Sequence, residues 1–194
     1  MDGMRTDAEL MELYRGGSRN AFEELFARHH RKVIHFCYRM TGDQARAEEA
    51  AQEVFLRIAR AASTYQPTAK FTTWMYTIAR RTTLNFLRDE KEHGEKIPIH
   101  ATGEEGDPAE EYPLPGPADW DPEQVVWGGE LKEKFLEALQ HLPEVNRVAF
   151  ILNRGDGLSY EEVATVLGVT VQAVKSRIFR AREMLLAELS GLLQ

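Results

Sequence analysis

The sequence predicts an all-α protein of two small helical domains joined by an acidic, flexible linker, with a helix-turn-helix in the C-terminal domain. Apolar residues recur at three- and four-residue steps on both sides of a central segment, without strand-like alternation. The central segment lacks this period and contains most of the chain's eight prolines. We therefore expect domains at residues 1–90 and 130–194 and a linker at 91–129.

Composition limits the class of protein. With 194 residues, 43% of them hydrophobic, the chain can bury a core, which excludes disorder throughout. The single cysteine, Cys37, excludes an internal disulfide framework and suits a reducing cytoplasm. The sequence shows neither a signal-peptide core nor an apolar run near the ~18 residues that span a bilayer. We expect a soluble cytoplasmic protein without membrane insertion.

The first domain is expected to contain three helices. The first lies within residues 21–43, the second is capped by Asp43 and runs to about Ala62, and the third starts near Phe71. The predicted inward positions of these helices are, in order, Phe22, Leu25, Phe26, His29, Val33, Phe36 and Met40; Ala47, Ala50, Val54, Phe55 and Ile58; and Trp74, Met75, Ile78 and Ala79. Tyr76 is left unassigned.

The negative charge of the chain lies in the middle. Residues 91–129 hold 2 basic and 10 acidic residues, whereas residues 1–90 hold 14 and 12 and residues 130–194 hold 8 and 9. Both domains are therefore close to neutral, although the formal net charge of the chain is -7. An acidic, proline-rich stretch of this kind is typical of a linker.

The second domain begins with two helices, of which Pro143 opens the second and Gly155 with Gly157 closes it. Ser159 and Glu162 then form the S-x-x-E pattern of a capping box at the start of a short helix. Gly168 ends this helix, and Thr170 suits the N-cap of a longer one. Two helices joined by such a short turn are the helix-turn-helix motif.

The last helix should present a basic outer face. Its predicted inward positions are Val171, Val174, Ile178, Ala181 and Leu185. The remaining side chains are of types that contact base edges or phosphates: Gln172, Ala173, Lys175, Ser176, Arg177, Phe179, Arg180 and Arg182. Basic residues also complement a helix dipole, but the capping box, the short turn and the absence of acid before Glu183 favour DNA binding.

Several stretches, in order, resemble the ECF (extracytoplasmic-function) sigma factors of bacterial RNA polymerase. AFEELFARHHRKVIHFCYRMTGD resembles the first helix and turn of that family, and AEEAAQEVFLRIARA resembles its segment that docks on the clamp helices of the polymerase. FTTWMYTIARRTTLNFLRDEK resembles the helix that reads the -10 element. The stretch from Leu142 to Leu185 resembles the domain that reads the -35 element beside the polymerase flap.

The resemblance implies a role for each surface. Clamp docking would use Glu48, Glu49, Gln52, Glu53 and Leu56. Recognition and melting of the -10 element would use Lys70, Thr73, Arg80, Arg81, Asn85 and Arg88, with Arg81 at a position where many relatives carry asparagine. Recognition of the -35 element would use Thr170, Gln172, Ala173, Lys175, Ser176, Arg177 and Arg180. The acidic linker would lie in the nucleic-acid path of the polymerase, and an anti-sigma factor is expected as a further partner.

Other functions have little support. His29, His30, His35 and Cys37 fall within one predicted helix, but their spacing matches no metal-ligand pattern. We expect no cofactor, and because phosphate-loop, dinucleotide and nucleophile-elbow motifs are absent, no enzymatic activity. Two alternatives stay open: a stand-alone helix-turn-helix regulator, and an interaction protein whose N-terminal domain binds a partner helix.

Overall fold

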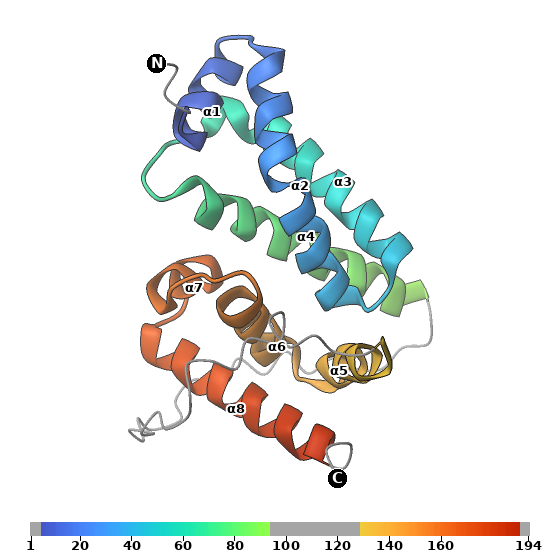
Figure 1. Cartoon of the computed structure of the whole chain (residues 1–194). Helices are drawn as coiled ribbons and strands as arrows, with labels where there is room; N and C mark the ends of the chain where they lie inside the picture. The colour runs from blue at the N-terminus through green and yellow to red at the C-terminus, as the bar shows by residue number, and fades with distance from the viewer. Residues whose placement is uncertain (1–4, 94–128, 191–194) are drawn as a thin grey trace.

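The computed structural model describes residues 5–93 and 129–190, and regular structure within these ranges is helical, without strands (Figure 1). The helices form two domains, which confirms the predicted fold class. Residues 94–128, most of the predicted linker, lie outside the described residues.

Four α-helices build the N-terminal domain: α1 (Asp7–Arg15), α2 (Arg19–Thr41), α3 (Gln44–Ala61) and α4 (Phe71–His93). A 3₁₀ turn, η1 (Ala62–Thr64), follows α3. Helix α2 packs against α1, α3 and α4, so that it forms the centre of the domain. The core between them is made of the buried side chains of Leu25, Val33, Phe36, Met40, Ala50, Val54, Ile58, Met75 and Ala79.

The predicted start of α3 at Asp43 is confirmed by its cap, whereas α2 begins two residues before the predicted range. Gly42 adopts φ +73° at the end of α2, where a left-handed residue stops the helix. The Asp43 side chain then accepts a hydrogen bond of 2.9 Å from the backbone N–H of Arg46 and opens α3. The two helices therefore meet at a tight corner.

Helix α1 was not predicted, although the sequence carries its signal. The Thr6 hydroxyl accepts from the backbone N–H of Glu9 at 3.3 Å, and the Glu9 carboxylate accepts from the Thr6 backbone N–H at 2.7 Å. This is a capping box of the same type as that of Ser159 and Glu162. Leu10 and Met11 of α1 are fully buried against the rest of the domain.

The predicted inward face of α2 was too wide. Phe26 is 43% exposed, while its neighbour Leu25 is 1% exposed. Successive residues lie about 100° apart around a helix, so Phe26 falls at the edge of the buried stripe. Its ring stacks on His30 and meets the ring of Phe55 edge-on.

In α4, Met75 and Ala79 are fully buried, whereas Trp74 and Ile78 pack against the core while half-buried. Tyr76, unassigned from the sequence, is 1% exposed. The buried side of α4 therefore includes an aromatic residue whose ring packs edge-on against Phe36 of α2.

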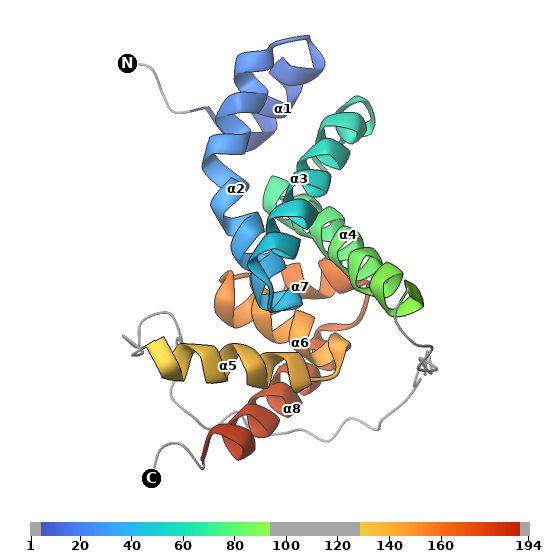
Figure 2. The same ribbon diagram turned by 90° about the vertical axis from the view of Figure 1, so that its right-hand side faces the viewer.

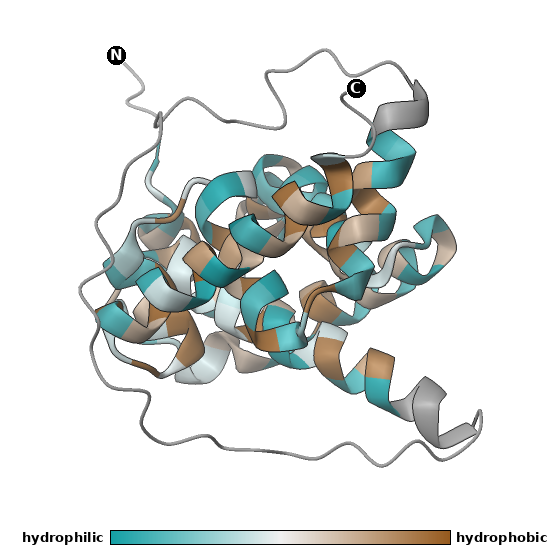
Figure 3. Ribbon diagram, turned by 90° about the horizontal axis from the view of Figure 1, so that it is seen from below, coloured by the Kyte–Doolittle hydropathy of each residue, from teal (hydrophilic) through white to brown (hydrophobic). Residues whose placement is uncertain are grey.

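The C-terminal domain contains α5 (Gly129–His141), α6 (Glu144–Phe150), α7 (Tyr160–Leu167) and α8 (Val171–Leu189). Pro143 is the N-cap of α6, as its sequence position predicts. Helix α6 continues as a wider π-helical turn, η2 (Ile151–Gly155), a local geometry that often accompanies functional sites. Hydrophobic and hydrophilic residues alternate along the helices (Figure 3). The core of this domain includes Leu139, Ile151, Leu152, Val163, Val174 and Leu185.

The two domains pack against each other (Figures 1 and 2). Helix α4 lies against α7, and α2 contacts α5 and η2. The helix-turn-helix of the C-terminal domain therefore lies next to the helix that was predicted to contact the -10 element.

Candidate nucleic-acid and protein-binding surfaces

The helix-turn-helix has the predicted caps. The Ser159 hydroxyl accepts from the Glu162 backbone N–H at 3.2 Å, and the Glu162 carboxylate accepts from the Ser159 backbone N–H at 2.8 Å. Gly168 ends α7 with φ +68°, and the Thr170 hydroxyl accepts from the Ala173 backbone N–H at 3.2 Å to open α8. These bonds define where α7 and α8 begin.

One face of α8 is buried as predicted. Val174, Ile178, Ala181 and Leu185 are at most 5% exposed, while Val171 is half-buried at the start of the helix. The residues of the candidate -35 set lie outside this buried face and are exposed to different degrees. Thr170, Gln172 and Arg180 are exposed, and Ala173, Lys175, Ser176 and Arg177 are half-buried.

Two basic side chains of this face are in contact with protein. The Lys175 ammonium lies 5.7 Å from the ring centre of Tyr160 on α7, within cation–π range. Burial lowers the pKa of Arg177, which indicates that its guanidinium is partly withdrawn from water. The basic face of α8 is therefore only partly available to DNA in this arrangement.

The candidate -10 residues divide into two groups. Arg81, Asn85 and Arg88 are exposed on α4. Lys70, Thr73 and Arg80 instead lie toward the C-terminal domain or the interior. Lys70 forms a 2.8 Å ion pair with Glu162 of α7, and Thr73 is 4% exposed.

Arg80 is half-buried close to charged groups of the C-terminal domain. Burial lowers its pKa, the carboxylate of Glu144 on α6 acts in the opposite direction, and the positive charges of Arg81 and Arg177 lower it further. The structure therefore brings a candidate -10 arginine and a candidate -35 arginine into one electrostatic environment.

The candidate polymerase-binding residues lie on the exposed side of α3. Glu48, Glu49, Gln52 and Leu56 are exposed, and Leu56 retains 51% of its surface although it is apolar. Glu53 accepts a 2.7 Å hydrogen bond from Arg57. Phe55 is 6% exposed, so the expectation that it belongs to the core is confirmed. Exposed apolar side chains next to acidic ones are suited to helix docking.

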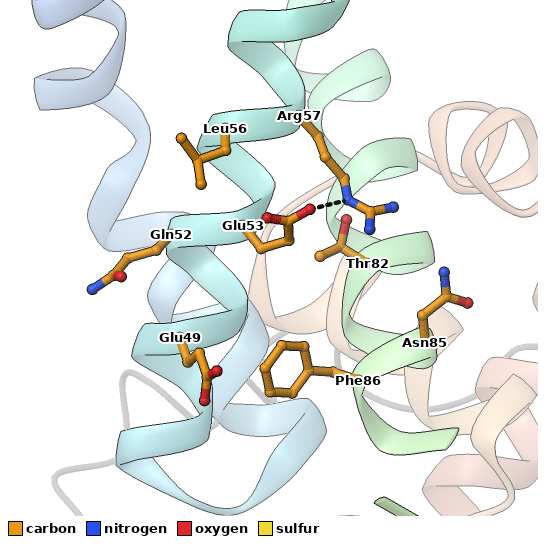
Figure 4. A pocket seen from close by; sticks show the side chains of 8 residues that line it. All are labelled: Glu49, Gln52, Glu53, Leu56, Arg57, Thr82, Asn85 and Phe86. Atoms are coloured by element: carbon orange, nitrogen blue, oxygen red, sulfur yellow. Dashed lines mark hydrogen bonds and ion pairs between the residues drawn. The ribbon is translucent and has the colours of Figure 1, made fainter. Parts of the chain in front are cut away.

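A pocket of about 400 Å³ joins this surface to α4 (Figure 4). Phe86 points from α4 toward α3, where Glu49 and the Glu53–Arg57 pair face it, and Asn85 lies at the α4 side of the opening. Asn85, assigned to the -10 set from the sequence, thus shares a pocket with residues assigned to polymerase docking. The residues lining the pocket are Glu49, Gln52, Glu53, Leu56, Arg57, Thr82, Asn85 and Phe86.

The histidines and Cys37 have separate surroundings. His29 lies 2.8 Å from Asp7, and burial lowers the pKa of its imidazole. The Cys37 thiol lies 3.4 Å from the Thr83 hydroxyl, and burial raises its pKa to about 11. Among residues 5–93 and 129–190, no group of three His, Cys, Asp or Glu side chains is arranged to hold a metal ion.

In the same ranges, none of the helices combines the length and apolarity needed to cross a bilayer.

Family comparisons agree with this architecture. Residues 25–93 match the family model Sigma-70 region 2, and residues 132–185 match Sigma-70, region 4. The RNA polymerase sigma factor CarQ of Myxococcus xanthus is 35% identical, over 95% of this chain and 97% of CarQ. The ECF RNA polymerase sigma-E factor of Escherichia coli (strain K12) is 33% identical over 94% of both chains.

Solved structures share the fold. The chain superposes with a TM-score of 0.69 on CnrH in complex with the cytosolic domain of CnrY, at 22% identity over 95% of this chain and 97% of CnrH. It superposes with a TM-score of 0.64 on the sigma factor RpoE in complex with the anti-sigma factor NepR from Bartonella quintana, at 22% identity over 87% and 96%.

Proposed function

The chain belongs to the ECF sigma factors of the sigma-70 family. From this premise we propose which of its surfaces binds the polymerase and which contact each promoter element. As an alternative sigma factor it confers promoter choice on core RNA polymerase. The N-terminal domain, residues 1–90, docks on the clamp helices and opens the -10 element. The C-terminal domain, residues 130–194, reads the -35 element beside the flap, and the acidic linker connects them.

The observation that carries the proposed polymerase contact is the exposed apolar side chain of Leu56 among the acids of α3. An isolated apolar side chain needs no special explanation, but here Phe86 and the pocket beside it continue the surface onto α4. Glu48, Glu49, Gln52 and Glu53 would supply charge and hydrogen bonds at the edge of the same contact.

The proposed -35 contact rests on α8. Its N-cap hydroxyl and buried side fix the orientation of the helix, so that Gln172 and Arg180 point into solvent. In a major groove these side chains would reach base edges, while Lys175 and Arg177 would neutralise phosphates or read guanine. For the -10 element, Arg81 and Arg88 are exposed, whereas Lys70 is paired with Glu162, Arg80 is half-buried and Thr73 is buried.

The polymerase would perform the chemistry, and the chain would contribute recognition without catalysis. The sequence motifs of nucleotide-binding or hydrolytic enzymes are absent from the chain. A stand-alone helix-turn-helix regulator would need no second domain with an exposed docking helix. The sigma assignment therefore accounts for both halves of the chain.

The deciding experiment combines the purified chain with bacterial core polymerase and a library of promoter sequences, followed by sequencing of the transcripts. The proposal predicts transcripts that start downstream of one -10 and -35 pair. Transcription no different from that of core polymerase alone would contradict it, and specific binding of the free chain to a palindromic duplex would favour the stand-alone regulator.

An anti-sigma factor is proposed as a further partner, because RpoE, with which this chain shares its fold, was solved in complex with the anti-sigma factor NepR. Such a partner would cover the exposed α3 surface. A candidate anti-sigma domain should then compete with core polymerase for the chain, and simultaneous binding of both would rule out that mode of inhibition.

A further inference from the structure

Lys175 leaves α8 at the edge of the buried stripe of that helix. It directly follows Val174, which is fully buried, and comes three residues before Ile178, which is 5% exposed. A residue at this position lies about 60° around the helix from Ile178, so its side chain emerges beside a neighbouring helix. Lys175 is accordingly half-buried, whereas Gln172 and Arg180 on the same helix are exposed.

The neighbour of Lys175 is Tyr160, the first residue of α7. The Tyr160 ring packs against the hydrophobic core while it stays half-buried. The Lys175 ammonium lies 5.7 Å from the centre of this ring, which is within the range of a cation–π interaction. The capping box of Ser159 and Glu162 encloses Tyr160 in sequence and defines where α7 begins, so the ring has a defined place.

Glu161, the next residue of α7, also senses this ammonium. Hydrogen bonds at the start of α7, first at its own backbone and then with Ser159, lower the pKa of the Glu161 carboxyl, and the positive charge of Lys175 adds to this effect. A carboxylate near the ammonium offsets the charge that would attract a phosphate. The ammonium keeps its N–H donors, which the acceptors of a base edge can bind.

A lysine side chain is usually a flexible point charge. Its ammonium stands on a four-carbon stem, and ordering this stem when DNA binds costs conformational entropy. A side chain that is already held before the DNA arrives avoids part of that cost. The contact with Tyr160 therefore makes Lys175 better suited to a directed hydrogen bond than an unconstrained lysine would be.

The position of Lys175 along α8 also favours a contact with bases. It is the fifth residue of a helix that begins at Val171. In a helix-turn-helix, the N-terminal residues of the second helix contact base edges, while the first helix crosses the DNA backbone. Tyr160, on the first helix, would then hold the lysine from outside the groove.

We propose that Tyr160 is a positioning residue of the -35 surface: its ring holds the Lys175 ammonium so that this lysine reads a base edge and does not merely neutralise a phosphate. The O6 and N7 acceptors of guanine are the base atoms that suit a lysine best. The reading of the -35 element by Lys175 rests on the proposed function, whereas the contact between Tyr160 and Lys175 does not.

The contact can be tested in the free chain, without polymerase or DNA. Protons above the face of an aromatic ring resonate upfield, so NMR should show an upfield shift for the ε-methylene protons of Lys175, a signal that Lys175→Ala identifies. The shift should persist in Tyr160→Phe, which keeps the ring, and disappear in Tyr160→Leu. An ordinary lysine shift in the wild-type chain would overturn the proposal.

The consequence is tested by transcription with core polymerase from single-base variants of the -35 element. Lys175→Ala should reduce the preference for one base at one position about tenfold. Tyr160→Leu should reduce the preference at the same position roughly two- to fivefold, while Tyr160→Phe should match the wild-type chain. The matched control is Tyr14→Leu, which changes a half-buried tyrosine that packs on Phe22 in the N-terminal domain and should leave the preference unchanged.

A double variant separates positioning from a general structural effect. If Tyr160 acts through Lys175, adding Tyr160→Leu to Lys175→Ala should change the base preference no further. A further loss in the double variant would show that Tyr160 acts independently of Lys175. Equal weakening of all promoter variants by Tyr160→Leu would indicate a phosphate contact or a damaged helix, and either result would overturn the proposal.

The outcomes distinguish this proposal from the proposed function. The upfield shift combined with no promoter-specific transcription by the wild-type chain would retain the contact and refute the proposed function. Promoter-specific transcription whose base preference is unaffected by Tyr160→Leu would retain the proposed function and refute the positioning role of Tyr160.

Discussion

Phe55 and Leu56 are neighbours in the chain with opposite surroundings, since Phe55 is 6% exposed and Leu56 is 51% exposed. Substitutions at the two positions therefore test different properties: Phe55 tests packing of the core, and Leu56 tests binding to polymerase. Phe55→Ala should lower the free energy of unfolding by ~3–5 kcal/mol, because it removes a core ring. Leu56→Ala should leave stability within ~0.5 kcal/mol but weaken binding to core polymerase about tenfold.

Urea unfolding and fluorescence anisotropy with labelled protein measure the two quantities. Equal polymerase affinity for the wild-type chain and Leu56→Ala would remove Leu56 from the docking surface. Glu12→Gln, which breaks an exposed pair with Arg15 on α1, is a suitable surface control.

Arg177 and Arg180 are a second pair of nearby residues that differ in exposure. Arg180 is exposed, whereas Arg177 is half-buried at the domain interface. If either side chain reads a guanine, its replacement by alanine should reduce preference at one -35 position by ~1–3 kcal/mol. A phosphate contact would instead weaken all promoters alike.

Transcription from a set of single-base promoter variants distinguishes these results. Glu188→Gln serves as the comparison, since Glu188 is exposed near the end of the same helix and lies outside the predicted basic face. Unchanged promoter preference and strength in both variants would mean that another face of α8 contacts DNA.

At the scale of helices, end caps decide where structure begins. Ser159 makes a side-chain capping bond at α7, whereas Ser18 is the N-cap of α2 without one. Ser159→Ala should therefore lower stability by about 1 kcal/mol, and Ser18→Ala by clearly less. Thermal unfolding of both variants followed by circular dichroism measures the difference, and equal losses would show that the capping box does not stabilise α7.

The helices that were predicted well have strong local signals. Asp43, Gly168 and Thr170 act at their own positions through hydrogen bonds to the nearest backbone, so sequence alone suffices to place them. Helix α1 carries an equivalent signal in Thr6 and Glu9, but only Leu10 and Met11 of this helix are buried, whereas α7 buries four residues. The cap of α1 is therefore not accompanied by an apolar period that would predict the helix.

The interface between the domains could not be predicted from the sequence. Arg39 and Asp156 are separated by more than a hundred residues, and nothing in their local patterns indicates that they pair. The burial of Thr73 and the exposure of Phe26 follow equally from which helices pack together. Periodicity identifies a buried side of a helix, but its width depends on the neighbours.

At the scale of the whole molecule, buried titratable groups tie stability to pH. Burial raises the pKa of Cys37 from 9.0 to about 11, so its neutral thiol stabilises the fold fully below pH 9. This contribution, roughly 2–3 kcal/mol, is lost as the pH rises toward 11. Burial also raises the pKa of the Tyr76 phenol, which acts in the same direction.

Urea unfolding at pH 8 and at pH 10.5 should therefore show lower stability at the higher pH. Cys37→Ala should show a smaller decrease between the two, whatever its stability at pH 8, with the remainder due in part to Tyr76. An equal decrease in the variant and the wild-type chain would mean that Cys37 does not contribute to the alkaline loss.

The way the C-terminal domain holds α2 has a consequence for genetics. Gln140 and Arg147 bind carbonyl oxygens of the main chain, which every amino acid supplies, so replacing the side chain of Met40 leaves its acceptor in place. Substitutions that weaken the contact between the two domains should consequently occur at Gln140, Arg147 and Asp156, but in the last turn of α2 chiefly at Arg39. If more of these substitutions fall in the C-terminal domain than in α2, the genetic result alone would indicate that side chains of the C-terminal domain bind the main chain of α2.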